Sequence, residues 1–259
     1  MIKPTNKANS ALKELHDMDE LAGGSSPVHK LHPLVKFIVT IAYIYCVVSF
    51  NKYDLTGIII MVFYPVLIYN AAGIPLSTCF WKLRLVLPLV LMVGVFNPIF
   101  EGKMGVISMV TLMLKGVFSL MASFILVATT PIDSLCAALR KIHIPSILVT
   151  LLLLTYRYIS VLVREVAIMT DAFKLRAPNQ KGVPVKTWGS FIGQLLLRSM
   201  DRANELYASM QLRSFNGEFF YANQRKVNGN DILFLAVCIV CFVIARLLNI
   251  TELIGGLFT

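Results

Sequence analysis

Apolar residues fill most of this chain in long blocks that short polar turns interrupt. Five blocks approach the ~20 residues that an α-helix needs to cross the hydrocarbon core of a bilayer. They cover residues 33–50, 55–70, 85–100, 106–128 and 231–248. This pattern predicts an all-α, polytopic helical membrane protein with about five transmembrane helices.

Residues 131–230 have a different pattern. Thr130-Pro131-Ile132-Asp133 is typical of a helix start, with Thr130 as the cap and Pro131 at the first helical position. Apolar residues then recur at helical spacing, at Ile132, Leu135, Cys136, Leu139 and Ile142. We expect this segment to be an amphipathic helix at the membrane surface.

Two long helices are expected after the amphipathic one. The first runs from Ser146 to Ala177 and stops at Pro178, because proline cannot continue a helix. The second runs from about Lys186 to Phe215 and stops at Asn216-Gly217. It carries an apolar stripe and two expected i,i+3 ion pairs on another face. The stripe is Met200, Ala203, Leu206, Tyr207 and Met210, and the pairs are Arg198/Asp201 and Arg202/Glu205.

Basic residues indicate which segments face the cytoplasm. The formal net charge is +10, and residues 131–230 carry 13 Lys and Arg against 6 Asp and Glu. Basic residues beside spans mark the cytoplasmic side. We therefore expect residues 1–30 to be a cytoplasmic segment with a flexible join at 23–26. Residues 31–130 would form a four-helix membrane region, 131–230 a cytoplasmic region, and 231–259 a final transmembrane helix with a short outer tail.

The segment 146–163 decides how many crossings there are. It is long enough to span but contains Arg157, and an arginine at mid-bilayer costs roughly 2.5–3.5 kcal/mol. If it crossed, Arg140 and Lys141 would lie on the opposite side from the basic residues after it. Five crossings with the N-terminus inside satisfy the charge rule throughout, and six crossings are the alternative.

Composition excludes a soluble enzyme. The chain is 57% hydrophobic and 15% charged, against about 25% charged in soluble domains. No basic run with interleaved aromatic residues points to nucleic acid. Cys238 and Cys241 form a C-x-x-C inside an apolar run, where small apolar side chains explain them better than a metal or redox site. The four histidines lack metal-ligand spacing. We expect no catalytic residue, metal site or cofactor.

The two long helices end in matched sequences, Ala172-Phe173-Lys174-Leu175-Arg176-Ala177 and Ser209-Met210-Gln211-Leu212-Arg213-Ser214. A basic residue in a last helical turn complements the helix dipole by about 0.3–1 kcal/mol, but this does not explain matched six-residue ends. Helices of about 30 residues reach on the order of 45 Å. Each arginine is therefore expected beyond the membrane surface, where its five-donor fork suits the carboxylates and carbonyls of a partner.

These ends resemble the paired x-Arg-x signature of the transmembrane coupling (T) component of energy-coupling factor transporters, the EcfT/CbiQ family. The start of the first span is similar to that family's Pro-x-His-Lys/Arg-Leu-x-Pro pattern, here Pro27-Val28-His29-Lys30-Leu31-His32-Pro33. The resemblance covers roughly residues 25–250. The family more often has Ala before and Gly after each arginine, so Leu175, Ala177, Leu212 and Ser214 depart from it.

The resemblance implies a non-catalytic scaffold of an ATP-driven importer for a metal ion or vitamin in a prokaryotic cell membrane. Each arginine motif would dock on one of two ABC-type ATPase subunits, and the membrane helices would hold a separate substrate-binding (S) membrane subunit in the lipid bilayer. ATP-driven closure would move the coupling region, residues 131–230, and tilt that subunit. The chain itself lacks a phosphate-binding loop, because Gly102-Lys103 is followed by Met104.

A self-contained secondary transporter or channel is the alternative. Such a protein needs ionisable residues within its spans. The predicted spans contain only Lys36, Lys115, Asp231 and Arg246, and Lys115 alone lies near the middle of one. Lys115 would line a helix interface, snorkel to the surface, or serve a substrate.

Overall fold

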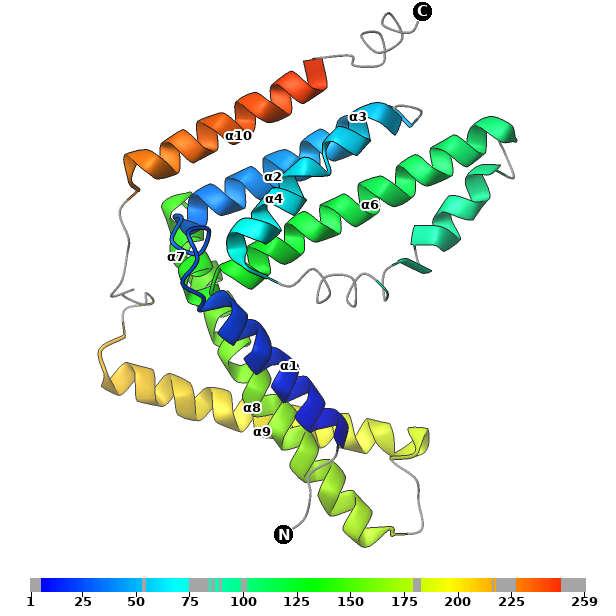
Figure 1. Cartoon of the computed structure of the whole chain (residues 1–259). Helices are drawn as coiled ribbons and strands as arrows, with labels where there is room; N and C mark the ends of the chain where they lie inside the picture. Colours follow the sequence, from blue (N-terminus) through cyan, green and yellow to red (C-terminus); the bar gives the residue numbers. More distant parts are fainter. Residues whose placement is uncertain are drawn as a thin grey trace, which may run out of the picture. The chain divides into compact units, whose positions relative to one another are not determined.

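A computed structural model of the chain describes residues 6–52, 55–74, 84, 87–88, 90–98, 102–178, 183–215, 217 and 227–247. All regular elements within these ranges are helices (Figure 1), which confirms the prediction of an all-α, polytopic membrane protein. Parts of the predicted span 85–100, of the loop after Pro178 and of the second helix stop lie outside the described residues, as does the tail after residue 247.

The helices group into two compact units, which we describe separately. The bundle unit comprises Leu21–Pro131 and Arg225–Thr259, and the long-helix unit comprises Met1–Glu20 and Ile132–Gln224. Three helices are long and apolar enough to cross a membrane by length and composition, over Gly105–Thr129, Ser146–Arg176 and Gly229–Arg246. Since the second of these contains the segment 146–163, five rather than six crossings stays a prediction.

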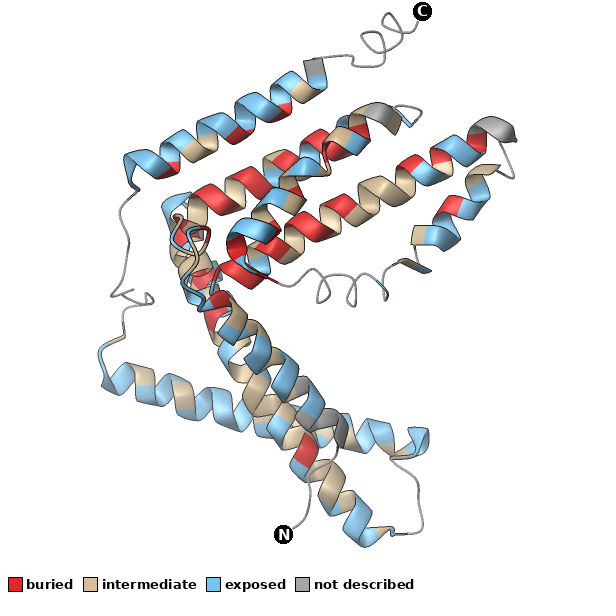
Figure 2. Ribbon diagram, viewed as in Figure 1, coloured by how far each residue is buried: buried red, intermediate tan, exposed pale blue. Residues whose placement is uncertain are grey.

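The helix α2 (Pro33–Ser49) forms the core of the bundle unit. It packs against both α6 (Lys103–Thr129) and α10 (Gly229–Leu247), as Figure 1 shows. Val39, Tyr43 and Val47 are fully buried at i, i+4 and i+8 (Figure 2), positions that share one helix face. This buried face of α2 therefore lies at the centre of the unit, while apolar side chains such as Tyr45 and Val48 on its other faces are exposed.

Two lysines bind the ends of neighbouring helices. Lys36, near the start of α2, donates from Nζ to the carbonyl of Thr129, the last residue of α6, at 2.7 Å and to that of His29 at 3.2 Å. Lys115 on α6 donates to the carbonyls of Val48 and Phe50 at the end of α2. The last carbonyls of a helix have no partner within it, and a membrane offers them no water. Lys115 therefore lines the interface of α2 and α6, one of the predicted roles.

Asp231 joins the starts of α2 and α10. Its carboxylate is 1% exposed and accepts the backbone N–H of His32, the N-cap of α2, at 3.2 Å. It also accepts the N–H of Asn228 at 2.9 Å, as in a capping box. A negative charge at two helix N-termini is favourable because both macrodipoles point their positive ends at it.

The predicted span 55–70 is broken in two. It forms α3 (Leu55–Ile60) and α4 (Phe63–Ala72), with turn residues between them. Pro65 has no N–H for the carbonyl of Met61, four residues earlier. The hydroxyl of Tyr43 donates to this carbonyl at 2.8 Å. The break therefore lies where a proline frees a carbonyl that the neighbouring helix can satisfy.

Hydrogen bonds of a histidine span the join between the first two helices, and the flexibility of residues 23–26 stays a prediction. The chain leaves α1 (Asn6–Ala22), and the His29 ring then bridges the Ser26 hydroxyl at 2.6 Å and the Leu21 carbonyl at 2.9 Å. Gly24 lies against this ring, and a Cβ there would lie 2.8 Å from its Nε2. The two hydrogen bonds of His29 therefore connect the end of α1 to the turn before α2.

In the long-helix unit, α7 (Ile132–Lys141) packs on the start of α8 (Ser146–Arg176). Cys136 of the predicted apolar stripe is fully buried with Val149 and Leu153 of α8, so protein covers the centre of the stripe. Burial, with the nearby charge of Asp133, raises the pKa of the Cys136 thiol to about 11.

The predicted cap of this helix is wrong. The helix begins at Ile132, and Thr130 instead ends α6 as its C-cap, with an extended backbone. Its buried hydroxyl has no hydrogen-bond partner within the described residues. Thr130 therefore closes α6, and its hydroxyl does not cap the start of α7.

Replacing Lys36 by methionine should destabilise the bundle unit. Methionine keeps the apolar stem but leaves the Thr129 and His29 carbonyls without this donor, which costs about 1–3 kcal/mol for a buried polar group. The thermal unfolding midpoint of the detergent-solubilised chain should fall. The exposed Lys30 gives the matched control, Lys30→Met. Equal midpoints for the two variants would contradict this role of Lys36.

Candidate functional site

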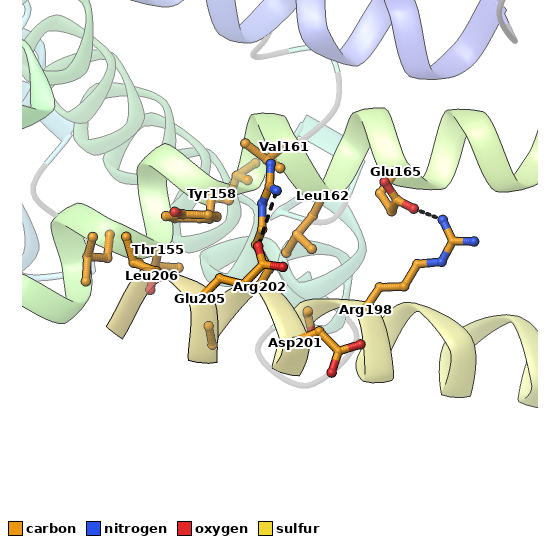
Figure 3. A pocket seen from close by; sticks show the side chains of 14 residues that line it. Thr155, Tyr158, Val161, Leu162, Glu165, Arg198, Asp201, Arg202, Glu205 and Leu206 are labelled. Atoms are coloured by element: carbon orange, nitrogen blue, oxygen red, sulfur yellow. Dashed lines mark hydrogen bonds and ion pairs between the residues drawn. The ribbon is translucent and has the colours of Figure 1, made fainter. Parts of the chain in front are cut away.

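The two long helices cross within their own unit. After a 3-10 turn (Val185–Thr187), α9 (Trp188–Leu212) runs across the middle of α8. A groove of about 620 Å³ lies along the crossing (Figure 3). Apolar side chains from both helices line it, among them Tyr158 and Leu162 of α8 and Leu206 of α9. No residue of α9 is buried, so much of its surface is free for contacts outside the chain.

An ion pair between the helices borders this groove. Arg198 of α9 reaches across to the carboxylate of Glu165 on α8, while Asp201 points away (Figure 3). The predicted Arg198/Asp201 pair is therefore wrong, because Arg198 finds a carboxylate on the neighbouring helix. The predicted pair Arg202/Glu205 is confirmed, at 3.7 Å. No sequence spacing signals a pair 33 residues apart, so sequence analysis missed Glu165.

The first matched end closes α8. Arg176 is its last helical residue and is exposed, and Leu175 beside it is 67% exposed. Ala177 has φ −133° and its N–H bonds the carbonyl of Phe173. Pro178 explains why Ala177 leaves the helical conformation, because proline disfavours the helical region for the residue before it.

The second matched end closes α9 with a different backbone. Ser214 has φ +56°, its N–H donates to Gln211 at 3.0 Å, and the N–H of Phe215 donates to Met210 at 3.0 Å. These two bonds form a Schellman cap with Ser214 in the left-handed position, where glycine is usual. Arg213 at the C-cap and Leu212 before it are exposed, the leucine by 89%.

The two matched ends, at Arg176 and Arg213, lie far apart along the long-helix unit. The hydroxyl of Thr150, near the start of α8, donates to the carbonyl of Gly217, four residues after Arg213, at 3.3 Å. Arg176 follows Thr150 by 26 residues of continuous helix, which is about 39 Å at 1.5 Å per residue. Neither arginine forms an ion pair with a described residue, although Lys174 pairs with Asp171 at 3.7 Å. The unit thus presents two separate, exposed Leu-Arg ends.

The described residues contain no group of three or more His, Cys, Asp or Glu side chains that could hold a metal ion. In the groove between α8 and α9, Arg198 pairs with Glu165 and Arg202 pairs with Glu205. The chemistry that this part of the chain offers is recognition by arginine and apolar contact.

Replacing Ser214 and Ala177 by glycine should have opposite effects. Ser214→Gly removes the strain of a left-handed residue with a side chain and should stabilise the end of α9 by about 0.5–1 kcal/mol. Ala177→Gly, at φ −133°, gains nothing and adds freedom to the unfolded chain. Hydrogen exchange at the Phe215 amide should slow in the first variant. Faster exchange there would disprove the cap.

Comparison with known proteins gives several relatives. Over 116 residues the chain is 31% identical to the nickel permease LarQ of Lactiplantibacillus plantarum, covering 45% of this chain and 42% of LarQ. Over 121 residues it is 30% identical to the cobalt transport protein CbiQ of Rhodobacter capsulatus, covering 46% and 50%. The chain thus matches about half the length of these two relatives or less.

A longer match joins the chain to a transporter component. Over 216 residues it is 26% identical to the energy-coupling factor transporter transmembrane protein EcfT of Leuconostoc gelidum, covering 74% of this chain and 81% of EcfT. Residues 24–226 also match the family described as Cobalt transport protein, CbiQ. The matched residues include both Leu-Arg ends and His29 in the turn before α2. The chain therefore belongs to the CbiQ family of membrane transport components.

Proposed function

We propose that this chain is the non-catalytic coupling scaffold of an ATP-driven importer, in which its two Leu-Arg ends dock on a pair of ABC-type ATPase subunits. The observation that carries the proposal is the pair of exposed ends at Arg176 and Arg213, one on each of two crossed helices. Arg176 lies about 39 Å along α8 from Thr150, which contacts the chain just after Arg213. A cation and an apolar side chain at each end suit one pocket on each of two similar subunits.

The exposed leucines favour docking over simple capping of the helix dipole. A dipole cap needs only the charge, and Lys174 already supplies one in the last turn of α8. Leu175 and Leu212 contribute nothing to a dipole, yet both face solvent in the chain alone. Arginine beside an exposed apolar residue is the composition that interface hot spots favour.

The exposed side of α9 supports a membrane partner. Ile192, Leu196, Met200 and Tyr207 recur at helical spacing, and each is more than half exposed. An apolar stripe of this length on a helix that buries no residue needs a cover. A separate substrate-binding membrane subunit would supply it. The relatives named for nickel and cobalt transport suggest a transition-metal ion as the substrate of that subunit, with a vitamin as the alternative.

A self-contained carrier is less well supported. Lys36 of α2, Lys115 of α6 and Asp231 of α10 are already used in helix-end contacts. Arg246 lies over the ring of Phe50, 4.9 Å from its centroid. A substrate path would have to break these bonds. The proposed orientation places the N-terminus and the long-helix unit in the cytoplasm of a prokaryotic cell, where ATP is available.

Reversing both arginines should detach the ATPases. In Arg176→Glu with Arg213→Glu, each end loses charge-assisted hydrogen bonds worth about 1.5–3 kcal/mol apiece and gains repulsion. We expect affinity for the ATPase subunits to fall by at least two orders of magnitude while membrane insertion is unchanged. The measurement is co-purification of the tagged, detergent-solubilised chain from its native membranes, with the ATPases identified by mass spectrometry.

Lys186→Glu is the matched control, because Lys186 is an exposed cation of the same unit and belongs to neither matched six-residue end. Arg→Lys at both positions keeps the charges but loses the planar fork, and should retain partial binding. Two similar ATPases and a small membrane protein in the wild-type eluate support the scaffold. If the charge-reversed variant still co-purifies with the ATPases, the arginines act only as helix caps. If the wild-type chain purifies alone and still transports a solute in liposomes, the carrier is favoured.

A further inference from the structure

A second groove lies in the bundle unit, between α2 and α10, and encloses about 290 Å³. Its lining residues recur at i, i+3, i+4 and i+7 on each helix, so one face of each helix forms it. They are Ala42, Tyr45, Cys46 and Ser49 on α2, and Ile239, Phe242, Val243 and Arg246 on α10. Since Asp231 joins the starts of the two helices, they run in the same direction and the groove leads toward the ends of both.

The floor of the groove is closed, whereas its walls are open. Cys46 and Phe242 form the floor, since both are buried and the Cys46 sulfur lies 3.6 Å from the Phe242 carbonyl oxygen. Tyr45 and Val243 form the walls and are 76% and 48% exposed in the chain. Because α10 is long and apolar enough to cross a membrane, hydrocarbon rather than water surrounds these walls in a bilayer. The groove is therefore suited to an acyl chain.

A cation stands at the end of the groove. Arg246, the residue before the last one of α10, is exposed and is the one charged side chain among the described residues that line the groove. Its guanidinium carbon lies over the ring of Phe50, the C-cap of α2, 4.9 Å from the ring centroid. Arg246 forms no hydrogen bond or ion pair with any residue that the structure describes. Phe50 therefore holds the charge at the level where both helices end, which is where a span meets the interfacial region of a bilayer.

The order of these groups along the groove matches that of a phospholipid. Arg246 follows Ile239 by seven residues, which is about 10 Å or two helical turns, so an apolar channel of that length leads from the cation toward the middle of the helices. The planar fork of arginine suits the oxygens of a phosphate group. A headgroup with net negative charge adds an attraction to the cation that a zwitterionic headgroup lacks.

We propose that the groove between α2 and α10 binds an anionic phospholipid, with one acyl chain along the groove and the phosphate on Arg246. Charge complementarity decides this choice of occupant, because the described lining of the groove is apolar apart from its end and holds a cation without an acidic side chain. The hydroxyl of Ser49, exposed at the same end, is a second hydrogen-bonding group for the headgroup. The site is independent of the proposed function, since a scaffold and a carrier meet the same bilayer.

The test is native mass spectrometry of the full-length, detergent-solubilised chain, titrated with phosphatidylglycerol or with phosphatidylcholine. The wild-type chain should bind phosphatidylglycerol more tightly. Arg246→Gln should lower the affinity for phosphatidylglycerol about fivefold, the effect of one cation near anionic lipid, and the affinity for phosphatidylcholine less. Arg246→Lys keeps the charge and should retain most of the preference. The matched control is Lys52→Gln, which should bind as the wild type does, because Lys52 is an exposed cation shortly after α2 that does not line the groove.

A second measurement locates the lipid. Phosphatidylglycerol with a photoreactive acyl chain should label peptides that contain Tyr45 or Val243, and Val243→Trp, which fills the groove, should reduce this labelling. Equal affinities of Arg246→Gln and Lys52→Gln for phosphatidylglycerol, or label confined to other helices, would overturn the site. So would a photoreactive residue in place of Val243 that cross-links in native membranes to a protein and not to lipid, since a protein would then occupy the groove.

Discussion

The bundle unit depends on hydrogen bonds to the terminal backbone groups of its helices, because a membrane offers these groups no water. Lys36 serves the end of α6 and Lys115 serves the end of α2, so the two helices each supply a donor for the other's last carbonyls. Asp231 accepts backbone N–H groups at the starts of α2 and α10. These three side chains account for charges that are otherwise costly within a span. They also set the register of α2 against both neighbours, because a shift of one turn would separate each charge from its helix end.

The long-helix unit, in contrast, has few buried side chains. Its helices bury little, since α9 has no buried residue and α8 buries only Val149, Leu153 and Ala167. Around the open groove α8 and α9 meet through apolar side chains, with the Glu165–Arg198 pair at its border. Exposed ion pairs contribute about 0–1 kcal/mol each. A unit of this kind leaves much of its apolar surface uncovered by its own side chains.

The sequence predicts the helices well because their causes are local. The hydrophobic blocks and Pro178 predict most of the observed helix ends, whereas the break between α3 and α4 was not predicted. The exposed positions of Arg176 and Arg213 follow from helix length alone. Contacts between distant segments could not be predicted in this way, because nothing in the spacing relates Arg198 to Glu165 or Cys46 to Phe242. The contact of the His29 ring with Gly24 in the join before α2 could not be predicted either, because it depends on how the turn folds back.

The two Leu-Arg ends look like duplicates in sequence but are mechanically unequal. Arg213 is the C-cap of a Schellman motif, whereas Arg176 is a helical residue followed by one residue and a proline. If the proposed function holds, a pair of identical subunits would meet two contacts with different backbones. The order in which the two contacts form and release would then be biased by the scaffold alone, so symmetry of the bound pair would be broken even when both of its members are the same protein.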